Sequence, residues 1–298
     1  MSKNWIEISL SNKHIKYYNY KDFFNFEVIG SGGFGKVYRA NWKNPRNTLA
    51  LKSLNDYTAK NIVYELTIQR DVDFHENIIR FLGITIDNQN SEKSGYMLVM
   101  EYANNGTLRS YLEKNIYNLT WNDKFKMAYQ LACAVSCLHD ENIIHCDLHS
   151  NNVLIHQNMI KLADFGLSKM IDGPSASEQG GVIPYTDPKR FVTYSYSLNQ
   201  KSDVYSIGVL LWEISSCRPP FKDKSNQFVL PIKISQGLRE TPISNTPKDY
   251  EKLYTDCWKH ESDDRPTIQN VVTRLEAIMT KYNITARSAW IPLMGSFI

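Results

Sequence analysis

The sequence predicts an α+β protein of two lobes, a small β-rich lobe followed by a larger helical one. In the first part of the chain, apolar and other side chains alternate in short runs, as strands require, and only one stretch looks helical. In the second half, apolar residues recur every three or four positions, the period of helices. The change of character at Glu101–Gly106 marks the hinge. A ligand is therefore expected in the cleft between the lobes.

The small lobe is expected to begin with two strands joined by a glycine-rich turn. Phe24, Phe26 and Val28 alternate with other residues before the turn, and Lys36–Ala40 alternates after it. A third strand is expected at Thr48–Leu51. The remaining elements expected in this lobe are a helix over residues 59–72 and strands near residues 78–86 and 96–100.

The large lobe is expected to be built from long helices. Thr120, with Asp123 three residues later, predicts the N-cap of the first. Val204–Ile214 is apolar on almost every face, which predicts a buried helix. Two short strands, Val153–Ile155 and Ile160–Ala163, are expected between these helices. Further helices are expected around residues 250–258 and after Pro266.

The composition is that of an ordinary soluble protein. Of 298 residues, 42% are apolar and 22% charged, and the net charge of +3 is too small to indicate nucleic acid or a membrane surface as a partner. Five cysteines without metal-ligand spacing favour reduced thiols. Met1–Asn4 does not resemble a signal peptide, and the longest apolar run, Ile207–Trp212, is too short to span a bilayer. We therefore expect a cytoplasmic protein.

The glycine-rich turn has the spacing Gly30-x-Gly32-x-x-Gly35. A dinucleotide-binding fold uses the same spacing, but there a helix must follow the loop, whereas strand-like Val37-Tyr38 follows here. A glycine hairpin allows backbone amides to close over phosphates without obstruction by Cβ atoms. The turn is therefore expected to be a phosphate lid, with a plain hairpin turn as the alternative.

Lys52 ends the third strand and needs a carboxylate if it points into the cleft. Glu65 is the candidate partner, since the stretch Ala59–Leu66 offers no other acid. An isolated pair of this kind is usually a surface feature. Beside a glycine loop and a metal-binding aspartate, it is expected to position a phosphate.

Two short motifs carry the predicted chemistry. The first runs from His145 to Asn152 and reads His-Cys-Asp-Leu-His-Ser-Asn-Asn; the second is Asp-Phe-Gly at Asp164–Gly166. Asp147 is expected to accept a hydroxyl proton, while Asn152 and Asp164 coordinate divalent cations that bridge the phosphates. His145 is expected to be structural, and Asp203 is expected to cap backbone amides of the loop that carries Asp147.

With these motifs in this order, the chain resembles a eukaryotic protein kinase. The resemblance covers roughly residues 23–280, and the branch it resembles most is the tyrosine-kinase-like one. It implies a bilobal kinase-like fold, ATP and Mg²⁺ (with Mn²⁺ as an alternative) as cofactors, and a protein substrate. The segments that carry the resemblance are residues 30–35, 49–52, 145–152, 164–166, 201–208, 212–213, 257–258 and 264–267, together with Glu65.

The resemblance also implies domain limits and nucleotide contacts. Residues 1–22 would be an N-terminal extension, 23–102 the small lobe, 103–282 the large lobe and 283–298 a C-terminal tail. Tyr17, Tyr18 and Tyr20 make the extension aromatic enough to dock on the small lobe. The implied contacts of the nucleotide are Ile29, Gly30, Ser31, Gly32, Gly33, Phe34, Gly35, Lys36, Val37, Ala50, Lys52, the gatekeeper Met100, Glu101 and Ala103 of the hinge, and Leu154.

The chain departs from the family pattern at several positions. Cys146 replaces the arginine that precedes the catalytic aspartate, and His149 stands where serine/threonine kinases carry lysine. Val182 replaces their threonine, but the arginine patterns of tyrosine kinases are also missing. Asp187-Pro188-Lys189 replaces Ala-Pro-Glu, so the usual pair with Arg265 cannot form; either another acid substitutes or Lys189 points to solvent. Gln69 is polar at a position that is usually apolar.

The leading hypothesis is an active protein kinase specific for serine and threonine. The alternatives are a nucleotide-binding pseudokinase scaffold, indicated by Cys146, His149 and Lys189, and a tyrosine or dual-specificity kinase. A dinucleotide oxidoreductase is disfavoured because no helix is expected after the glycines. The sequence leaves open the substrate protein, its pathway, the mode of activation and the oligomeric state.

Cys146 generates a first prediction. A neutral thiol cannot pair with a phosphate on the activation segment, as the usual arginine does. Replacing Ser168, Ser175 and Ser177 by alanine or aspartate should therefore change turnover by less than about tenfold. The charge-assisted contact between an arginine and the phosphate is missing in the wild type as well as in the variants. Steady-state kinetics of the variants measure this, and a hundredfold change in turnover would contradict it.

Overall fold

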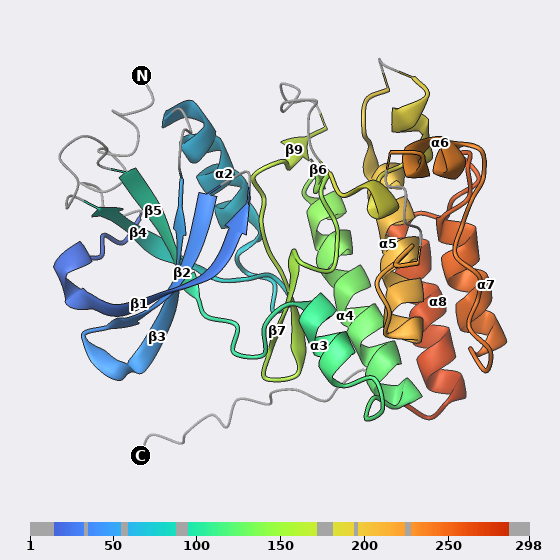
Figure 1. Cartoon of the computed structure of the whole chain (residues 1–298), viewed down its shortest axis with the longest axis horizontal. Helices are drawn as coiled ribbons and strands as arrows, with labels where there is room; N and C mark the ends of the chain where they lie inside the picture. Colours follow the sequence, from blue (N-terminus) through green and yellow to red (C-terminus); the bar gives the residue numbers. More distant parts are fainter. Residues whose placement is uncertain are drawn as a thin grey trace.

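The computed structural model describes residues 15–32, 35–54, 59–87, 95–171, 181–193, 196–223 and 228–285, with the backbone alone described for residues 59–61. The predicted α+β architecture of two lobes is confirmed: a β-sheet with one helix lies at one end of the molecule and a bundle of helices at the other (Figure 1). Within the described residues, no helix is both long enough and apolar enough to cross a bilayer.

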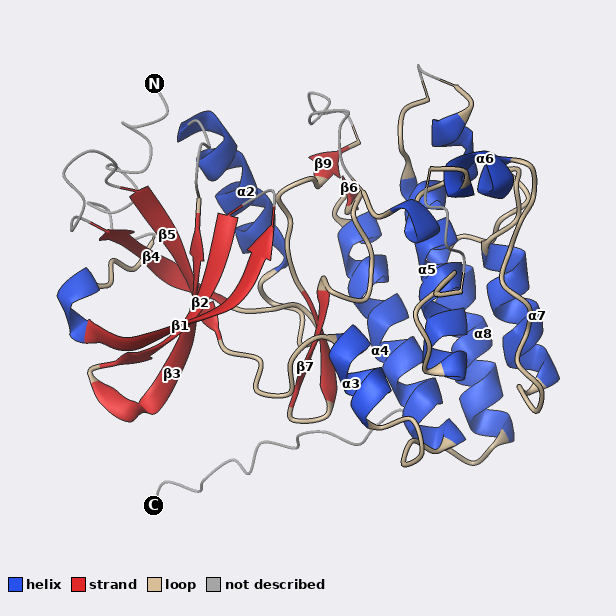
Figure 2. Cartoon of the chain, in the orientation of Figure 1, coloured by secondary structure: helices blue, strands red, loops and turns tan. Residues whose placement is uncertain are grey.

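The small lobe is built on a five-stranded sheet in which all neighbouring strands are antiparallel (Figure 2). The strand order is β1-β2-β3-β5-β4, so β4 lies at one edge. The strands are β1 (Phe23–Gly32), β2 (Gly35–Trp42), β3 (Asn44–Ser53), β4 (Phe81–Asp87) and β5 (Gly95–Glu101).

Helix α2 (Ala59–Val72) has the bounds that the sequence predicts. Its Ile62 and Leu66 lie in a buried apolar cluster with Ile84 of β4 and Leu98 of β5, so α2 covers one face of the sheet. A separate cluster, which includes Leu51, covers the opposite face. Burial of each such side chain contributes about 1.5–3 kcal/mol.

The described part of the predicted N-terminal extension packs against this sheet. Ile15 and Tyr18 are buried, which confirms the docking of an aromatic residue and corrects the expectation that this segment lies outside the core. A 3₁₀ turn, η1 (Tyr20–Asp22), leads into β1. The limits of the domains themselves stay a prediction.

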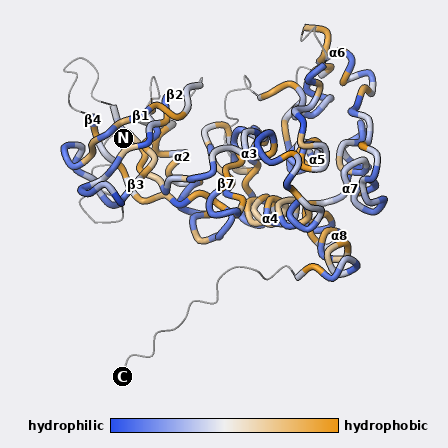
Figure 3. The backbone as a smooth tube through the Cα atoms, turned by 60° about the horizontal axis from the view of Figure 1, so that its bottom comes forward, coloured by the Kyte–Doolittle hydropathy of each residue, from blue (hydrophilic) through white to orange (hydrophobic). Residues whose placement is uncertain are grey.

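The large lobe contains six α-helices among the described residues. Its core consists of apolar side chains from α4, α5, α7 and α8, and Figure 3 shows the apolar stretches that recur along α4 and α8. Two short antiparallel pairs, β6–β9 and β7–β8, lie beside this core. The elements are α3 (Leu108–Lys114), α4 (Trp121–Asp140), β6 (Ile143–Ile144), β7 (Val153–His156), β8 (Met159–Leu162), β9 (Lys169–Met170), the 3₁₀ turns η2 (Ile183–Tyr185) and η3 (Pro188–Phe191), α5 (Gln200–Ser216), α6 (Leu230–Ser235), α7 (Lys248–Cys257) and α8 (Ile268–Lys281).

The capping and burial predictions for this lobe are confirmed. The Thr120 hydroxyl accepts a hydrogen bond from the Asp123 backbone N–H, and the Asp123 carboxylate accepts one from the Thr120 N–H, a complete capping box. In α5, every residue from 202 to 216 is buried, because neighbouring helices surround it. Helices α3 and α6 were not predicted, since one or two turns show little periodicity.

The predicted strand near residues 78–86 is wrong at its start. Ile78 and Ile79 do not pair with the small-lobe sheet. Ile78 forms an isolated parallel bridge with Leu162 of β8, and the Ile79 N–H donates to the Leu162 carbonyl at 2.9 Å. β4 therefore begins at Phe81, after the chain has contacted the large lobe.

Both outcomes expected for the altered Asp187-Pro188-Lys189 segment are found: another acid pairs with Arg265, and Lys189 points toward solvent. Asp187 takes over the carboxylate role: its oxygens lie 2.6 and 3.1 Å from the Arg265 guanidinium nitrogens, and both side chains are fully buried. Lys189 turns to the surface and pairs with Glu261 at 2.5 Å. Burial alone would raise the pKa of Asp187, but the hydrogen bond and charge of Arg265 outweigh it and lower that pKa.

This exchange of roles predicts an asymmetry in stability. Asp187→Ala should lower the free energy of unfolding by about 3–5 kcal/mol, because it leaves the buried Arg265 guanidinium without a counter-charge. Lys189→Ala, the matched control from the same segment, should change it little, because that pair is exposed. Urea denaturation of both variants tests this. Equal losses would show that Asp187 does not replace the missing glutamate.

Candidate active site

The glycine-rich segment forms the tip of the β1–β2 hairpin. Gly32 pairs with Gly35, and β2 begins at once, so the predicted hairpin is confirmed and a dinucleotide loop is excluded. Gly35 has φ +128°, and a Cβ there would lie 2.1 Å from the Ser53 carbonyl oxygen. Only glycine fits this close approach of β2 to β3. The predicted contacts Gly33 and Phe34 lie outside the described residues.

Lys52 lies between two carboxylates from different parts of the chain. Its Nζ is 2.6 Å from Glu65 Oε1 of α2 and 2.9 Å from Asp164 Oδ1 of the Asp-Phe-Gly segment. The predicted Lys52–Glu65 pair therefore forms, and it joins β3, α2 and the large lobe. The Lys52 and Glu65 side chains are only 6% and 5% exposed, whereas Asp164 is 28% exposed, so the pair is shielded from water on the α2 side.

The protonation behaviour of the three groups follows from one cation sharing two anions. Burial disfavours the Lys52 cation, but the charges of Asp164 and Glu65 outweigh it and raise the Lys52 pKa. The pKa of Glu65 is raised because burial dominates over the attraction of Lys52. The pKa of Asp164 is lowered, since Lys52 outweighs the burial of that carboxylate. Lys52 thus stays charged, and Glu65 bears most of the cost of burial.

Asp203, at the start of α5, anchors the loop that carries Asp147 by hydrogen bonds. The Asp203 carboxylate accepts hydrogen bonds from the backbone N–H groups of His145 (2.9 Å) and Cys146 (3.1 Å), as predicted. His139 Nε2 lies 2.9 Å from the same carboxylate. This anchor explains how Cys146 keeps a left-handed backbone, φ +66°, that a non-glycine residue adopts only at a cost.

His145 has the structural role that was expected. Its ring is fully buried, its Nδ1 accepts the Asp147 backbone N–H at 3.3 Å, and its Nε2 lies 3.2 Å from the Ala163 carbonyl. The ring packs on Phe165 with centroids 5.4 Å apart. His145 thereby joins the two predicted catalytic motifs.

Asp147 and Asn152 face each other across one turn of the loop. The Asn152 Nδ2 donates to the Asp147 backbone carbonyl at 2.9 Å and to Asp147 Oδ2 at 3.2 Å. His149 Nε2 lies 3.5 Å from the same Oδ2, and His149 Nδ1 accepts the Asn151 N–H. Oδ2 is thus occupied by groups of its own loop, which leaves Oδ1 to accept from a ligand.

The hinge is tied to both lobes through Glu101. Its carboxylate lies 2.9 Å from Lys161 Nζ of β8 and accepts the Arg80 backbone N–H at 2.8 Å. The predicted adenine contacts Ala50 and Met100 are register partners on β3 and β5. The other predicted nucleotide residues within the described ranges are Ile29, Gly30, Ser31, Gly32, Gly35, Lys36 and Val37 on the hairpin, Ala103 after the hinge and Leu154 on β7.

Comparisons with known proteins agree with this geometry. The family model of the protein tyrosine and serine/threonine kinases matches residues 25–275. This chain belongs to the protein kinase family. Members of the family transfer the γ-phosphoryl group of ATP to protein hydroxyls.

Similar individual proteins include one from Acanthamoeba polyphaga mimivirus named "Putative serine/threonine-protein kinase/receptor R826", 30% identical over 262 residues. Ephrin type-B receptor 1 of Gallus gallus is 31% identical over 269 residues, and ephrin type-A receptor 1 of Mus musculus 30% over 266. Each match covers 85% of this chain. The chain spans only 15% of the viral protein and 26% of each ephrin receptor.

The kinase site also contains a buried network that the sequence did not predict. Arg109 of α3 lies 2.7 Å from Glu213 of α5 and donates to Ser150 (2.9 Å) and to the Tyr185 hydroxyl (2.6 Å). Tyr185 in turn donates to Glu213 at 2.6 Å. The network fastens η2 to the catalytic loop through four elements. The only sequence signal was Trp212-Glu213, which had been noted without a role.

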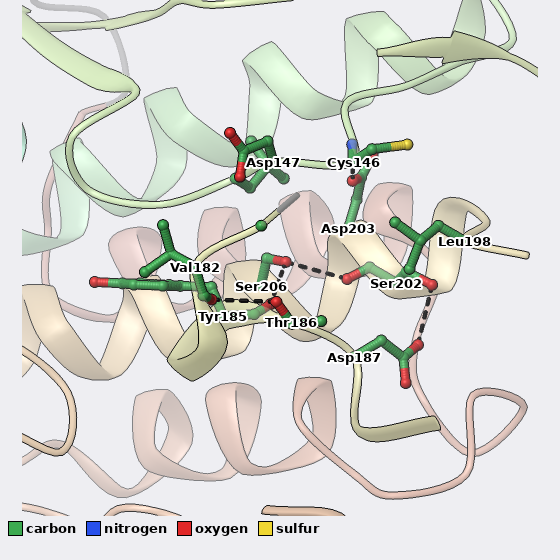
Figure 4. A pocket seen from close by; sticks show the side chains of 12 residues that line it. Cys146, Asp147, Val182, Tyr185, Thr186, Asp187, Leu198, Ser202, Asp203 and Ser206 are labelled. Atoms are coloured by element: carbon green, nitrogen blue, oxygen red, sulfur yellow. Dashed lines mark hydrogen bonds between the residues drawn. The ribbon is translucent and has the colours of Figure 1, made fainter. Parts of the chain in front are cut away.

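A small cavity lies beneath η2, between the catalytic loop and α5 (Figure 4). Its volume is about 10 Å³, which is room for about one water molecule. In Figure 4, Asp147 and Cys146 lie on one side of it and Tyr185, Ser202 and Ser206 on the other, with the Ser206 hydroxyl donating to the Tyr185 carbonyl at 2.7 Å. This cavity is a packing gap between kinase elements and is too small for a substrate.

The surroundings of Cys146 disfavour the thiolate form of its side chain. Its pKa is raised, above all by burial and next by the Asp203 carboxylate, although Lys169 and Arg190 oppose the shift. Ser168, which the first prediction includes as a phosphorylation site, is fully buried and donates to the His145 carbonyl at 3.2 Å. Its inclusion is wrong, and the kinetic prediction applies to Ser175 and Ser177, which lie outside the described residues.

The Lys52 geometry predicts a pH-dependent loss of stability. Lys52→Met removes the cation that pairs with both carboxylates and so raises the folded-state pKa of Glu65 further above its unfolded value. Stability is then fully present below the unfolded pKa and is lost as the pH rises through the folded pKa. At pH 8 the variant should be less stable than the wild type by about 3 kcal/mol, the low end for breaking a buried pair, and at pH 5 by clearly less.

Denaturant unfolding at the two pH values measures this difference. The double variant Lys52→Met/Glu65→Gln is the control, because it removes the Glu65 carboxylate as well. Its deficit should vary less with pH than that of the single variant, since only Asp164 is then left without its cation. A single-variant deficit that is the same at pH 5 and pH 8 would show that Glu65 is not the group responsible.

Proposed function

We propose that this chain is an active ATP- and Mg²⁺-dependent protein kinase that phosphorylates serine and threonine hydroxyls. One observation supports it most: Lys52 contacts Glu65 and Asp164 at the same time. This contact requires α2 and the Asp-Phe-Gly segment to be in place together, which catalysis by protein kinases demands.

Asp147 is the proposed catalytic base. Since Asn152 and His149 lie against its Oδ2, the free Oδ1 would accept the proton of the substrate hydroxyl. Lys52 would contact the phosphates of ATP, and the glycine hairpin would close over them with its backbone amides. In this mechanism the protein positions the reactants and neutralises charge.

The donor atoms present suit Mg²⁺ or Mn²⁺. Asn152 uses its Nδ2 on Asp147, which leaves its amide oxygen for a cation, and Asp164 uses Oδ1 on Lys52, which leaves Oδ2. Hard oxygen ligands of this kind hold Mg²⁺ together with substrate phosphates. In the described part of the chain, no group of three or more His, Cys, Asp and Glu side chains could hold an ion alone. The phosphates would thus complete the site, and the ion would neutralise their charge.

The hydroxyl class is the finer part of the proposal. The resemblance to the tyrosine-kinase-like branch and the printed name of the viral relative support serine and threonine. The matched family model includes tyrosine kinases as well, so a tyrosine or dual-specificity kinase is the second candidate. His149 and Val182 replace the lysine and threonine of serine/threonine kinases, but the arginine patterns of tyrosine kinases are also missing, so these positions favour neither candidate.

A cytoplasmic location is part of the same proposal. All five cysteines are free thiols, which suits a reducing compartment. The small net charge gives no reason to propose nucleic acid or a membrane as a partner.

Phosphate transfer from labelled ATP to a generic protein substrate tests the proposal. The purified chain with Mg²⁺ should label the substrate on serine or threonine, and excess EDTA should abolish the label. Asp147→Asn should lower turnover by about 10²–10⁴-fold, the usual contribution of a general base, and Lys52→Met should do so as well. Asp263→Asn, an exposed aspartate of the large lobe, is the matched control and should keep full turnover.

The identity of the labelled amino acid decides the hydroxyl class. Label on tyrosine alone would overturn the serine/threonine assignment and establish the second candidate. Saturable binding of ATP without transfer to any protein, the chain itself included, would overturn the active kinase in favour of the pseudokinase scaffold.

A further inference from the structure

Residues 15–18, here called the edge segment, run along the exposed side of β4. The Tyr18 N–H donates to the Ile84 carbonyl at 2.9 Å, and the Ile84 N–H donates to the Lys16 carbonyl at 3.0 Å. Tyr17 and Ile84 form a parallel bridge. Since β4 is an edge strand, the edge segment satisfies backbone groups that would otherwise be open to solvent or to another chain.

The edge segment also packs on both faces of the sheet. Ile15 is 7% exposed and lies in the cluster that contains Ile62 and Leu66 of α2. Tyr18 is 5% exposed and lies in the cluster on the opposite face, where its ring meets Trp42 edge-on with centroids 5.0 Å apart. The segment therefore wraps around the edge of the sheet.

Strand β4 carries a glycine where the edge segment comes closest. Gly83 has φ +149°, and a Cβ at this position would lie 2.2 Å from the Lys16 carbonyl oxygen. Only a residue without a Cβ allows this approach. The Lys16 side chain also binds aromatic rings of the small lobe. Its Nζ lies 4.4 Å from the Tyr18 ring centroid and 5.0 Å from that of Trp42, which are cation–π contacts. The contact is thus built into the strand.

Helix α2 needs support beyond its ion pair. Glu65 uses only Oε1 on Lys52, and Oε2 is buried with no hydrogen-bond partner among the described residues. Burial raises the pKa of this carboxylate, which means that the folded position of Glu65 is electrostatically costly. The apolar cluster of Ile15, Ile62, Leu66 and their neighbours must therefore offset that cost.

We propose that Ile15 is a positioning residue for phosphate transfer. Packed in the α2 cluster, it keeps the helix against the sheet so that Glu65 reaches Lys52, and the backbone bonds of the edge segment keep Ile15 in place. Ile15 lies in the apolar cluster beneath α2, so it acts through Glu65. The structural part of this inference stands alone, and only its effect on turnover rests on the proposed kinase activity.

Hydrogen exchange of the full chain tests the structural part without any need for activity. In Ile15→Ala, the amides of α2 should exchange about tenfold or more faster than in the wild type, because local opening becomes easier, while α4 and α5 keep their protection. Ile15→Val should restore most of the protection. Leu49→Ala, which shortens a side chain on the opposite face of the sheet, is the matched control and should leave α2 unchanged. Equal α2 exchange in Ile15→Ala and wild type would overturn the proposal.

Turnover tests the coupling to Glu65. At a temperature where all variants are folded, Ile15→Ala should lower kcat about tenfold, as expected for residues that act through one another. In a Glu65→Gln background, the same change should cost little more, since the pair it serves is already gone. Independent, multiplying losses would overturn the proposal. If the wild type transfers no phosphate at all, the proposed function fails, and the exchange comparison still decides the role of Ile15.

Discussion

The structure depends on one shared cation. Lys52 comes from a strand of the small lobe, Glu65 from the helix beside it, and Asp164 from the large lobe, and each carboxylate is useful to the site only when the lysine reaches both. Because a buried carboxylate without a counter-charge is costly, each of the three elements stabilises the positions of the other two. The interaction therefore both fixes the relative positions of the elements and assembles the phosphate-binding groups.

Much of the fold could be predicted because its signals are local. The capping box at Thr120 and the uninterrupted apolar run in α5 depend on residues a few positions apart, and both were predicted correctly. The Lys52–Glu65 pair was found by elimination, since its helix offers no other acid. The substitute for the missing glutamate was not identified, because Asp187 and Arg265 are far apart in the chain and only the tertiary structure shows which acid reaches the guanidinium. The Arg109 network was missed for the same reason.

The departures from the kinase pattern leave the site intact because backbone contacts support it. Cys146 removes a cation, yet Asp203 still accepts hydrogen bonds from the backbone N–H groups of His145 and Cys146, and His145 still joins the two motifs. The like charges of Lys189 and Arg265 are separated, since one points to Glu261 and the other is enclosed with Asp187. These departures from the pattern thus change which partners a charge has, while Asn152 still donates hydrogen bonds to Asp147.

The same reasoning explains why the family is evident and the hydroxyl class is not. Two of the ion pairs that cross between the lobes, Lys52 with Asp164 and Lys161 with Glu101, lie on the nucleotide side of the site, where all protein kinases face the same ligand. In the proposed reaction the acceptor hydroxyl would lie instead beside His149 and the segment around Val182, where this chain matches neither pattern. A serine differs from a tyrosine hydroxyl by its reach from the peptide backbone, so the depth of the site beneath the hydroxyl decides between them. In the proposed kinase, η2 would set that depth, and the Arg109–Tyr185–Glu213 network fastens η2 to the catalytic loop. The network that the sequence did not predict therefore bears most directly on the question that the sequence leaves open.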